Sequence, residues 1–294
     1  MHILMTGATG FIGQPLCEHL INDGHRLTIL TRRPLANVAS CIYIDKLETV
    51  NPGERIDAVI NLAGASLAER RWTPEYKREI LASRLDITEG LLQLLQRLES
   101  KPKVLLSASA IGYYGHHGSD KLDEAGSCTP GFSQDLCERW ERLALTACKL
   151  DVRVCLLRLG VVLDGDGGAF TQMARPFNFG VANWLGGGDQ WLSWVHRRDV
   201  IRAIGFLLQR DELDGPFNIT APQAVSSRGF CEAMKRHKRT FISIPVPAAI
   251  MRLMIGEMAQ ELLLNGQRVV PAALQQAGFI FEFPDIDASL ADIL

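Results

Sequence analysis

The sequence lacks the features that define several protein classes. Its seven cysteines are scattered, and none belongs to a Cys-x-x-Cys pair. A disulfide framework is therefore not predicted, and reduced thiols in a cytoplasmic protein fit this pattern better. No apolar run reaches about 18 residues, and the first residues, MHILMTGATG, lack the basic start of a signal peptide. We predict a cytoplasmic protein that makes no membrane contact.

A strong net charge is also absent. The 31 Lys and Arg residues against 33 Asp and Glu residues give a formal net charge of -2. The overall field therefore offers no attraction to nucleic acid or to a membrane surface, and an anion would need a local site. Neither an internal repeat nor a low-complexity segment interrupts the 294 residues.

The first half of the chain alternates short apolar runs with longer amphipathic stretches. We expect strands in HILMTG, RLTILT, CIYI, DAVINLAG, KVLLSAS and VRVCLLRLGVVL, and helices over residues 11–23, 73–98 and 133–149. Thr73 is the expected N-cap of the second helix, with Pro74 at its first position. Alternating strands and helices predict an α/β, Rossmann-type doubly wound parallel sheet, whose ligand crevice lies at the carboxyl ends of the strands.

A glycine-rich loop, TGATGFIG over residues 6–13, stands where the first strand turns into the first helix. Gly7 would permit the tight turn, Gly10 the approach of a pyrophosphate, and Gly13 the close packing of helix on strand. The helix N-terminus would offer free N–H groups to the phosphates. This context predicts a dinucleotide site; the alternative is a tight turn that holds no ligand.

The end of the second strand indicates which dinucleotide is bound. It reads Leu30-Thr31-Arg32-Arg33 and lacks the acidic residue that would hold the ribose 2′-OH of NAD. An arginine there can bind a 2′-phosphate with its planar fork of donors. We therefore predict NADP (NADPH) as the cofactor, with an ordinary solvated pair of arginines as the alternative.

These motifs follow one another in a recognisable order. TGATGFIG, NLAG, SASAIGYYG, LLRLGVVL, WVHRRDV and GPFNIT resemble the extended short-chain dehydrogenase/reductase superfamily, in its NAD(P)-dependent epimerase/dehydratase branch. Over essentially the whole chain, INLAGASLAERRWTPEYKREILASR, LGGGDQWLSWVH and GQRVVPAALQQAGFIFEFPD are similar to a subfamily of epimerase-like proteins. The resemblance implies a nucleoside-diphosphate-sugar epimerase-like oxidoreductase or isomerase.

The resemblance also implies cofactor contacts at several strand ends. Leu62 and Ala63 would line the nicotinamide-ribose side, while Thr31 and Arg32 would meet the adenosine phosphate. The expected cofactor-binding residues are Gly7, Thr9, Gly10, Phe11, Ile12, Gly13, Thr31, Arg32, Leu62, Ala63, Gly64, Glu79, Arg84, Ser107 and Leu159.

Two of these residues, Glu79 and Arg84, stand on the helix that follows the Arg-Arg-Trp stretch. Positions five apart on a helix are offset but share a broad face, so both side chains can reach one ligand. The alternative is that they belong to a charged outer face together with Lys77 and Arg78.

Catalysis in the superfamily uses a serine or threonine after the fifth strand with a tyrosine and a lysine spaced Tyr-x-x-x-Lys. The lysine lowers the pKa of the phenol, which then exchanges a proton with the substrate hydroxyl. Ser109 occupies the serine position, with Ser107 as a less favoured substitute. In PGFSQDLCERWE we assign the lysine position to Asp135 and the tyrosine position to Gly131. The usual pair is therefore predicted to be missing.

Tyr113 and Tyr114 are the available phenols, and Tyr114 matches the tyrosine of the loop that borders the substrate in the superfamily. An unassisted phenol, with a pKa near 10, would be a slow base. His116 and His117 titrate nearer neutral pH, but a solvated histidine is the usual outcome in a glycine-bounded loop. The candidate catalytic residues are Ser109, Tyr114 and Tyr113, and no metal site is predicted because ligand spacing is missing.

Three further residues are candidate substrate contacts. Arg158 could face an anionic group at a strand end, or it could form a buried ion pair. Trp191 could stack on a sugar or aromatic ring, or it could fill an interface together with Trp194. His196 belongs with Asp199 to a motif that we interpret as mainly structural, with the aspartate bonding to backbone.

The whole pattern predicts an NADP-binding domain over residues 1–163. A smaller substrate lobe, interleaved with the core, would follow over 164–294 and include a C-terminal extension from about 245. The predicted function is hydride transfer on a small hydroxylated or nucleotide-sugar-like substrate. The alternative is a catalytically silent NADP-binding regulatory or scaffold protein, for example in cell division. A homodimer is compatible with either function.

Overall fold

The computed structural model describes residues 1–294. Its central sheet is parallel, with the strand order β12-β7-β5-β4-β1-β2-β3. The strands are β1 (His2–Thr6), β2 (Arg26–Leu30), β3 (Cys41–Ile44), β4 (Ala58–Asn61), β5 (Val104–Ala110), β7 (Arg153–Leu159) and β12 (Gly215–Ile219). The chain runs outward from β1 to β3 and then crosses back to β4, so the order reverses between β1 and β4. This topology confirms the predicted Rossmann-type sheet and places the ligand crevice at that reversal.

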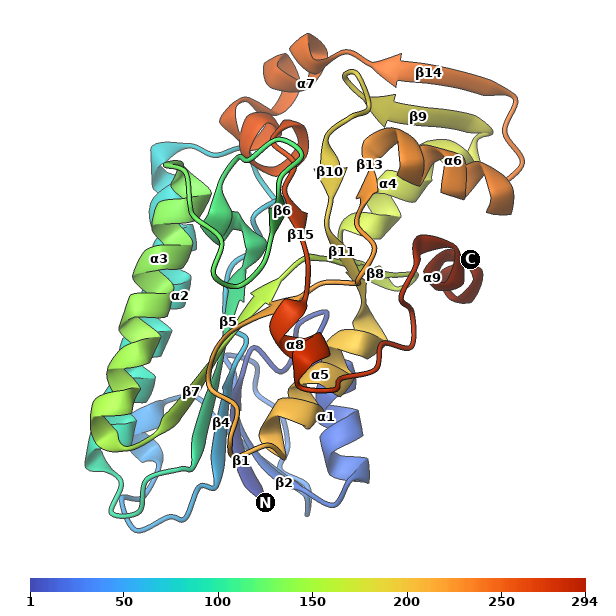
Figure 1. The fold of residues 1–294 in the computed structure, drawn as a ribbon. Coiled ribbons are helices and arrows are strands. Elements are labelled where there is room, and N and C mark those ends of the chain that lie inside the picture. Colours follow the sequence, from blue (N-terminus) through green and yellow to red (C-terminus); the bar gives the residue numbers. More distant parts are fainter.

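Helices cover both faces of this sheet (Figure 1). One face carries α2 (Pro74–Arg97) and α3 (Phe132–Ala144), and the other carries α1 (Gly13–Asn22) and α5 (Arg197–Leu208). The predicted start of α2 is confirmed, because the Thr73 side chain accepts a hydrogen bond from the Tyr76 N–H at 3.2 Å. Such a cap satisfies one of the N–H groups that a helix start leaves unpaired.

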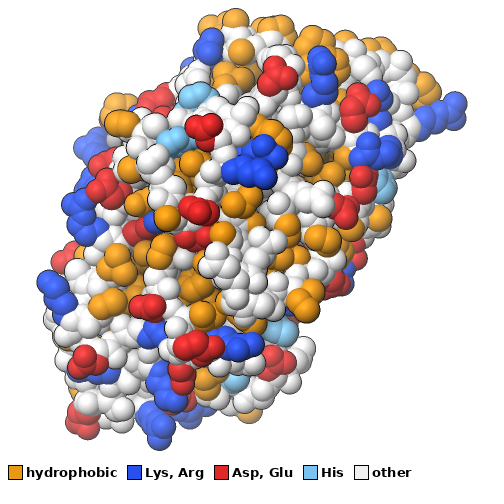
Figure 2. All heavy atoms as spheres, viewed as in Figure 1, with side chains coloured by type: hydrophobic (Ala, Val, Ile, Leu, Met, Phe, Trp, Pro, Cys, Tyr) orange, Lys and Arg blue, Asp and Glu red, His pale blue; other side chains and the backbone are white.

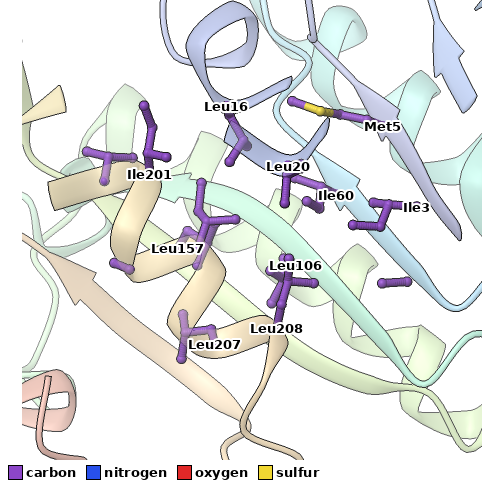
Figure 3. Packing of buried hydrophobic residues seen from close by; sticks show 14 of the residues in the cluster. Ile3, Met5, Leu16, Leu20, Ile60, Leu106, Leu157, Ile201, Leu207 and Leu208 are labelled. Carbon is purple, nitrogen blue, oxygen red and sulfur yellow. The ribbon is translucent and has the colours of Figure 1, made fainter. Parts of the chain in front are cut away.

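The largest core cluster lies between the sheet and the layer of α1 and α5 (Figure 3). Leu16 and Leu20, one turn apart on α1, are 0% and 1% exposed, because their spacing keeps them on the face that meets the sheet. Facing them are Ile3, Met5, Ile60, Leu106 and Leu157 from the strands, and Ile201, Leu207 and Leu208 from α5. Truncating one such leucine to alanine costs about 2–5 kcal/mol, so this cluster fixes α1 and the loop before it.

The predicted sixth strand is wrong in one respect: it breaks into two strands at Gly160. β7 ends at Leu159, and β8 (Val161–Asp164) leaves the sheet to pair with β11 (Trp194–His196). A Cβ on Gly160 would lie 2.7 Å from the Ser193 carbonyl oxygen, so only glycine fits where the chain turns. The apolar run continues through this turn because β7 is buried and β8 is at least half-buried.

The rest of the chain builds a second lobe above the carboxyl ends of the strands (Figure 1). A core cluster of 13 buried residues, with Phe170, Phe177, Trp194 and Phe230 among them, holds this lobe together. Its other elements are α4 (Gly168–Asn178), β9 (Val181–Leu185), β10 (Trp191–Leu192), β13 (Val225–Ser226), α6 (Ser227–His237), β14 (Ile242–Val246), α7 (Ala248–Ile255) and α9 (Ile286–Ile293).

Several segments from the second half return to the sheet side of the molecule. β12 joins the sheet edge next to β7, and α8 (Ala272–Gln276) packs on β12. A π-helical turn over Ala259–Leu264 precedes β15 (Arg268–Val269), which pairs with β6 (Lys121–Leu122). The helices are all too short or too polar to cross a membrane.

Candidate functional site

The glycine loop between β1 and α1 is packed so closely that side chains are excluded. Gly7 has a φ of +69°, and a Cβ there would lie 2.4 Å from the Leu62 carbonyl oxygen. A Cβ on Gly13 would lie 2.2 Å from the Gly7 carbonyl oxygen. No side chain caps the start of α1. The loop therefore presents bare backbone and the positive end of a helix, which suits a pyrophosphate.

The end of β2 lies beside this loop because β1 and β2 are register partners, with Thr6 opposite Leu30. Thr31 is half-buried, and its hydroxyl accepts a hydrogen bond from the Arg33 N–H at 3.1 Å. Arg32 is exposed and forms neither an ion pair nor a hydrogen bond within the protein. Its guanidinium is therefore available to a ligand phosphate.

A cavity of about 440 Å³ opens beyond the ends of β4 and β5. Its wall is mostly apolar, which lowers the local dielectric and strengthens any hydrogen bond made inside it. The lining residues used below are Ile12, Leu62, Ala63, Gly64, Arg84, Ser109, Ser133, Cys137, Trp140, Leu159, Trp191, Glu261, Asn265 and Gln267.

The α3 face toward this cavity differs from the assignment made on the sequence. Ser133 and Cys137, one helical turn apart, line the cavity. Asp135 is exposed and pairs with Arg139, so placing the lysine position at Asp135 is wrong. A shift of two residues rotates a side chain by about 200° around a helix, which is why Asp135 points away. The two α3 residues four apart at the cavity are thus Ser133, which carries a hydroxyl, and Cys137, which carries a thiol.

Neither α3 group is ionised at neutral pH. Burial and, to a smaller extent, the nearby Glu141 charge raise the pKa of the Cys137 thiol to about 11. The Ser133 hydroxyl is buried and has no hydrogen-bond partner in the protein. Buried polar atoms are rarely left unpaired, so this hydroxyl indicates room for a ligand group.

Arg84 from α2 is 9% exposed and lines the same cavity. Its Nη1 donates to the Ile80 carbonyl at 3.1 Å, and its Nη2 donates to the Ala65 carbonyl at 3.1 Å. No carboxylate pairs with it, and burial lowers the pKa of its guanidinium. Its Nε has no acceptor in the protein, which leaves a donor for a bound group.

Ser109 stands at the end of β5, where its Oγ donates a 2.6 Å hydrogen bond to Glu141 Oε1. Glu141 also binds Arg158 with two hydrogen bonds of 2.9 Å, Nε to Oε1 and Nη2 to Oε2. Because Ser109 and Arg158 are register partners on β5 and β7, the sheet itself brings the three side chains together.

With this geometry established, the chain can be compared with known proteins. The model of the NAD dependent epimerase/dehydratase family matches residues 3–220, which contain the glycine loop, Ser109 and α3. The chain belongs to this family. Residues 246–293 match a second model, a domain of unknown function called DUF1731. The C-terminal extension predicted from about residue 245 therefore corresponds to a separate family model.

Curated relatives of this epimerase/dehydratase family member share its full length. "Epimerase family protein SAR0825" from Staphylococcus aureus (strain MRSA252) is 36% identical over 300 residues, covering 99% of this chain and 98% of the relative. "Epimerase family protein SSP1921" from Staphylococcus saprophyticus is 36% identical over 297 residues, covering 100% and 99%.

Among solved structures, that of human epimerase family protein SDR39U1 (isoform2) with NADPH superposes with a TM-score of 0.89 at 30% identity. The superposition covers 100% of this chain and 99% of the human chain. A nucleoside-diphosphate sugar epimerase from Corynebacterium glutamicum gives 0.81 at 26% identity, covering 100% of this chain and 58% of the other.

The phenol predicted to act in catalysis, Tyr114, lies outside the cavity of this family member. It is 0% exposed; its hydroxyl donates to Asn218 Oδ1 at 2.7 Å and accepts from Arg158 Nη1 at 2.9 Å. Burial raises its pKa to about 12, so the phenol stays protonated. Tyr114 and Arg158 thus form a buried structural network behind the cavity wall. For Arg158, this is the buried ion pair that the sequence analysis gave as the alternative to a substrate contact.

Four other residues considered for the site lie away from Ser109. The Tyr113 ring stacks on Arg158, whose Cζ is 3.5 Å from the ring centroid. His116 is exposed, His117 is half-buried, and neither lines the cavity. Glu79 is exposed beside Arg70, on the outer side of α2. None of these four side chains meets Ser109.

The other residues predicted to bind the cofactor also differ in where they lie. Ile12, Leu62, Ala63, Gly64 and Leu159 are in the cavity wall, whereas Thr9 is exposed at the loop. The Phe11 ring packs against Gly167 and Gly168 of the second lobe. Ser107 is fully buried, and its hydroxyl has no partner.

Of the tryptophans, Trp191 lines the cavity and Trp194 lies in the core of the second lobe, where its Nε1 donates to the Gln223 carbonyl. His196, 1% exposed, stacks on Phe283 and caps α5 through an N–H of Arg198. The structural interpretation of Asp199 is confirmed, because its carboxylate accepts the backbone N–H groups of residues 282 and 283 at 2.9 Å.

Sequence reasoning missed the contribution of the C-terminal extension to the cavity. Glu261, Asn265 and Gln267 lie in its wall, and Glu261 Oε2 accepts a 3.2 Å hydrogen bond from the Ser133 N–H at the start of α3. No local signal marks these residues, because their role depends on a fold-back of more than 120 residues. No group of three or more His, Cys, Asp or Glu side chains is arranged to hold a metal ion.

Proposed function

We propose that this protein binds NADPH in the glycine loop and acts by hydride transfer. It would be an epimerase-like oxidoreductase or isomerase for a small hydroxylated or nucleotide-sugar-like substrate. The observation that carries the proposal is the loop itself, where the spaces that Cβ atoms would fill at Gly7 and Gly13 are taken by backbone. Such bare backbone at a helix start fits a dinucleotide pyrophosphate.

The choice of NADPH over NADH rests on Arg32. This side chain is exposed at the end of β2, without a carboxylate partner, where a dinucleotide fold places the adenosine ribose. A 2′-phosphate would satisfy its donors, whereas a 2′-OH would leave them in water. The human relative, 30% identical, has been solved with NADPH.

The nicotinamide, when bound, supplies the hydride donor or acceptor for the substrate carbon. The chain itself contributes orientation and exclusion of water. Ser109 donates its only hydroxyl hydrogen to Glu141, so toward the cavity its oxygen can accept a hydrogen bond from a substrate hydroxyl. The α3 segment FSQDLCERWERLA contains neither tyrosine nor lysine. Proton transfer would therefore not follow the Tyr-x-x-x-Lys scheme.

A specific observation favours a second candidate, a catalytically silent NADP-binding protein with a regulatory or scaffold role. The α3 groups at the cavity, Ser133 and Cys137, are uncharged at neutral pH, and Tyr114 is sealed in a buried network. A site whose tyrosine and lysine positions hold an uncharged hydroxyl and an uncharged thiol can retain a nucleotide and still lack turnover.

A fluorescence titration with NADPH and NADH tests the cofactor proposal. We expect NADPH to bind more tightly than NADH, and Arg32→Ala to weaken NADPH by about 10-fold or more, or about 1.4 kcal/mol. Arg175→Ala, at an exposed arginine of α4 without an ion pair, is the matched control and should bind like the wild type. Equal affinity for both nucleotides, unchanged in Arg32→Ala, would refute the NADP assignment.

A metabolite screen that follows nucleotide oxidation or reduction separates the two candidates. Turnover that is lost in Ser109→Ala while NADPH still binds supports the enzyme. Absence of turnover with every hydroxylated or carbonyl compound tested, despite tight NADPH binding, supports the silent binder.

A further inference from the structure

One stretch of the C-terminal extension, residues 248–265, is attached to the protein more loosely than the chain on either side of it. It comprises α7 and the π-helical turn over Ala259–Leu264. Its inner side supplies Glu261, Leu262 and Asn265 to the wall of the large cavity beyond β4 and β5. Figure 1 shows this segment at the top of the molecule, between the second lobe and the starts of α2 and α3.

Apolar burial fastens the segment only weakly. Met258 and Ala259 are its only buried side chains, 7% and 0% exposed, and neither belongs to a core cluster. α7 has no buried residue, and its Leu253 and Met254 are 80% and 62% exposed. Figure 2 shows hydrophobic atoms at the top of the molecule, where α7 lies. Because removal of apolar surface from water is the main force that holds elements together, apolar packing hardly opposes displacement of this segment.

The polar attachment of the segment consists of one ion pair and two hydrogen bonds. Glu257 pairs with Lys77 of α2, and Glu261 Oε2 accepts the Ser133 N–H of α3 at 3.2 Å. The Leu253 carbonyl accepts a 3.5 Å hydrogen bond from the loop before α2. The remaining hydrogen bonds of the segment are local to it. Because the carboxylate of the ion pair is 47% exposed, water screens the pair and its contribution is small.

Both ends of the segment are fixed, which limits how it can move. Before it, Val246 ends β14, and its carbonyl accepts the Gly186 N–H at 2.9 Å. After it, Gly266 lies so close to Trp191 that a Cβ would be 2.3 Å from the Trp191 backbone nitrogen. Gly256, with a φ of +63°, stands between α7 and the π-helical turn. A segment that is weakly held between two fixed ends can swing about those ends as a flap.

We propose that residues 248–265 form a lid over the large cavity, held closed by their polar contacts with α2 and α3. Opening gives ligands and solvent access to Cys137, which lines the cavity. Closing excludes water from the same space. The inference goes beyond the proposed function, because it concerns access to the cavity and applies to an enzyme and to a silent nucleotide binder alike.

Alkylation of Cys137 by N-ethylmaleimide measures lid opening, because this thiol lines the cavity and is 3% exposed. Peptide mass spectrometry separates its modification from that of the other cysteines. We expect Glu257→Gln to speed the alkylation by about 2- to 5-fold, the effect of losing an exposed ion pair. Glu232→Gln breaks a similar pair with Lys235 on α6, and this matched control should react like the wild type.

Salt provides a second test that needs no substitution. High salt screens the ion pair between α2 and the lid, so it should speed the alkylation of Cys137 in the wild type and have little effect in Glu257→Gln. Cys155, fully buried in the main core, reports whether the fold stays intact. Opening confined to the lid modifies Cys137 while Cys155 stays protected.

Three results would overturn the lid: equal rates at Cys137 in the wild type and Glu257→Gln, an equal acceleration in Glu232→Gln, or modification of Cys137 and Cys155 in step. If Glu257→Gln proves to be unfolded, the salt dependence of the wild type decides. Acceleration at Cys137 alone then supports the lid, and a rate that does not change with salt refutes it.

Discussion

Two buried arginines, on either side of α3, have opposite surroundings. Arg158, 3% exposed, forms two hydrogen bonds with Glu141 and a third with the Tyr114 hydroxyl. Arg84, 9% exposed, donates hydrogen bonds only to backbone carbonyls and Ser83, lies with its Cζ 5.3 Å from the Trp140 ring centroid, and lines the large cavity. Burial opposes both charges. The contacts with Glu141 outweigh burial and raise the pKa of Arg158, whereas nothing comparable offsets burial at Arg84, whose pKa is lowered.

The difference separates a structural charge from a charge that awaits a ligand. A buried cation with its own carboxylate belongs to the fold, because removing either partner leaves an uncompensated charge. A buried cation without a carboxylate, placed at a cavity, is neutralised only when a group from outside arrives. Proximity to a strand end, which made Arg158 a candidate substrate contact, does not tell these cases apart.

The strongest test of this comparison removes the carboxylate that pairs with Arg158 and, separately, the charge of Arg84. Glu141→Ala leaves Arg158 buried without its partner, and we expect it to lower the free energy of unfolding by about 3–5 kcal/mol. Arg84→Met deletes an unpaired charge and should change it by at most about 1 kcal/mol, with either sign. Urea unfolding monitored by circular dichroism measures both. Equal losses in the two variants would refute the distinction.

A smaller effect is expected within the structural network. Tyr114→Phe removes a hydroxyl that serves both Arg158 and Asn218, so it should cost about 1–3 kcal/mol in urea unfolding. Tyr113→Phe is the matched control, because its hydroxyl forms no hydrogen bond in the protein and its ring stays on Arg158. A control that loses as much stability as Tyr114→Phe would show that the ring rather than the hydroxyl matters.

Alkaline pH probes the same hydroxyl. The pKa of Tyr114 is raised from 10.0 to about 12 in the folded protein, so the unfolded chain loses this proton first. Because burial disfavours the phenolate, this titration leaves the stability of the fold unchanged below about pH 10 and lowers it as the pH rises toward about 12. Over this interval, Tyr114→Phe should reduce the pH dependence of the unfolding free energy by at most about 1.4 kcal/mol per pH unit. Identical slopes in wild type and variant would contradict the raised pKa.

The smallest effect is expected on the cavity side. Glu261 accepts an N–H at the start of α3 from a half-buried position, without a cationic partner. Glu261→Ala should therefore cost about 0.5–1 kcal/mol, the usual range for a helix N-terminal contact. Glu138→Ala, in an exposed pair with Arg142 on the same helix, should cost less than Glu261→Ala, because water screens an exposed pair. A loss of several kcal/mol at Glu261 would place it with Glu141.

Much of the fold could be predicted from the sequence because its signals are local. The glycine spacing before α1, the Thr73 cap and the alternation of strands with helices each depend on a few neighbouring residues. The break at Gly160 could not be seen, since β8 is as apolar as β7 and only its partner β11, far along the chain, draws it away.

The site was less predictable because its register and partners are not local. The phase of α3 decides whether Asp135 or Cys137 meets the cavity, and an error of two residues reverses the answer. Glu141 was not singled out at all, although it holds both Ser109 and Arg158. The role of Glu261 depends on a segment that no periodic pattern connects to α3.

The position of β12 in the sheet has a consequence for folding during synthesis on the ribosome. This edge strand, residues Gly215–Ile219, is synthesised only after α4, β9 and α5, yet it pairs with β7. Until then the β7 edge presents unpaired backbone groups, which are a template for pairing with another chain. A fragment that ends near residue 163 should therefore aggregate, and a nascent chain should need protection until about residue 219 has emerged.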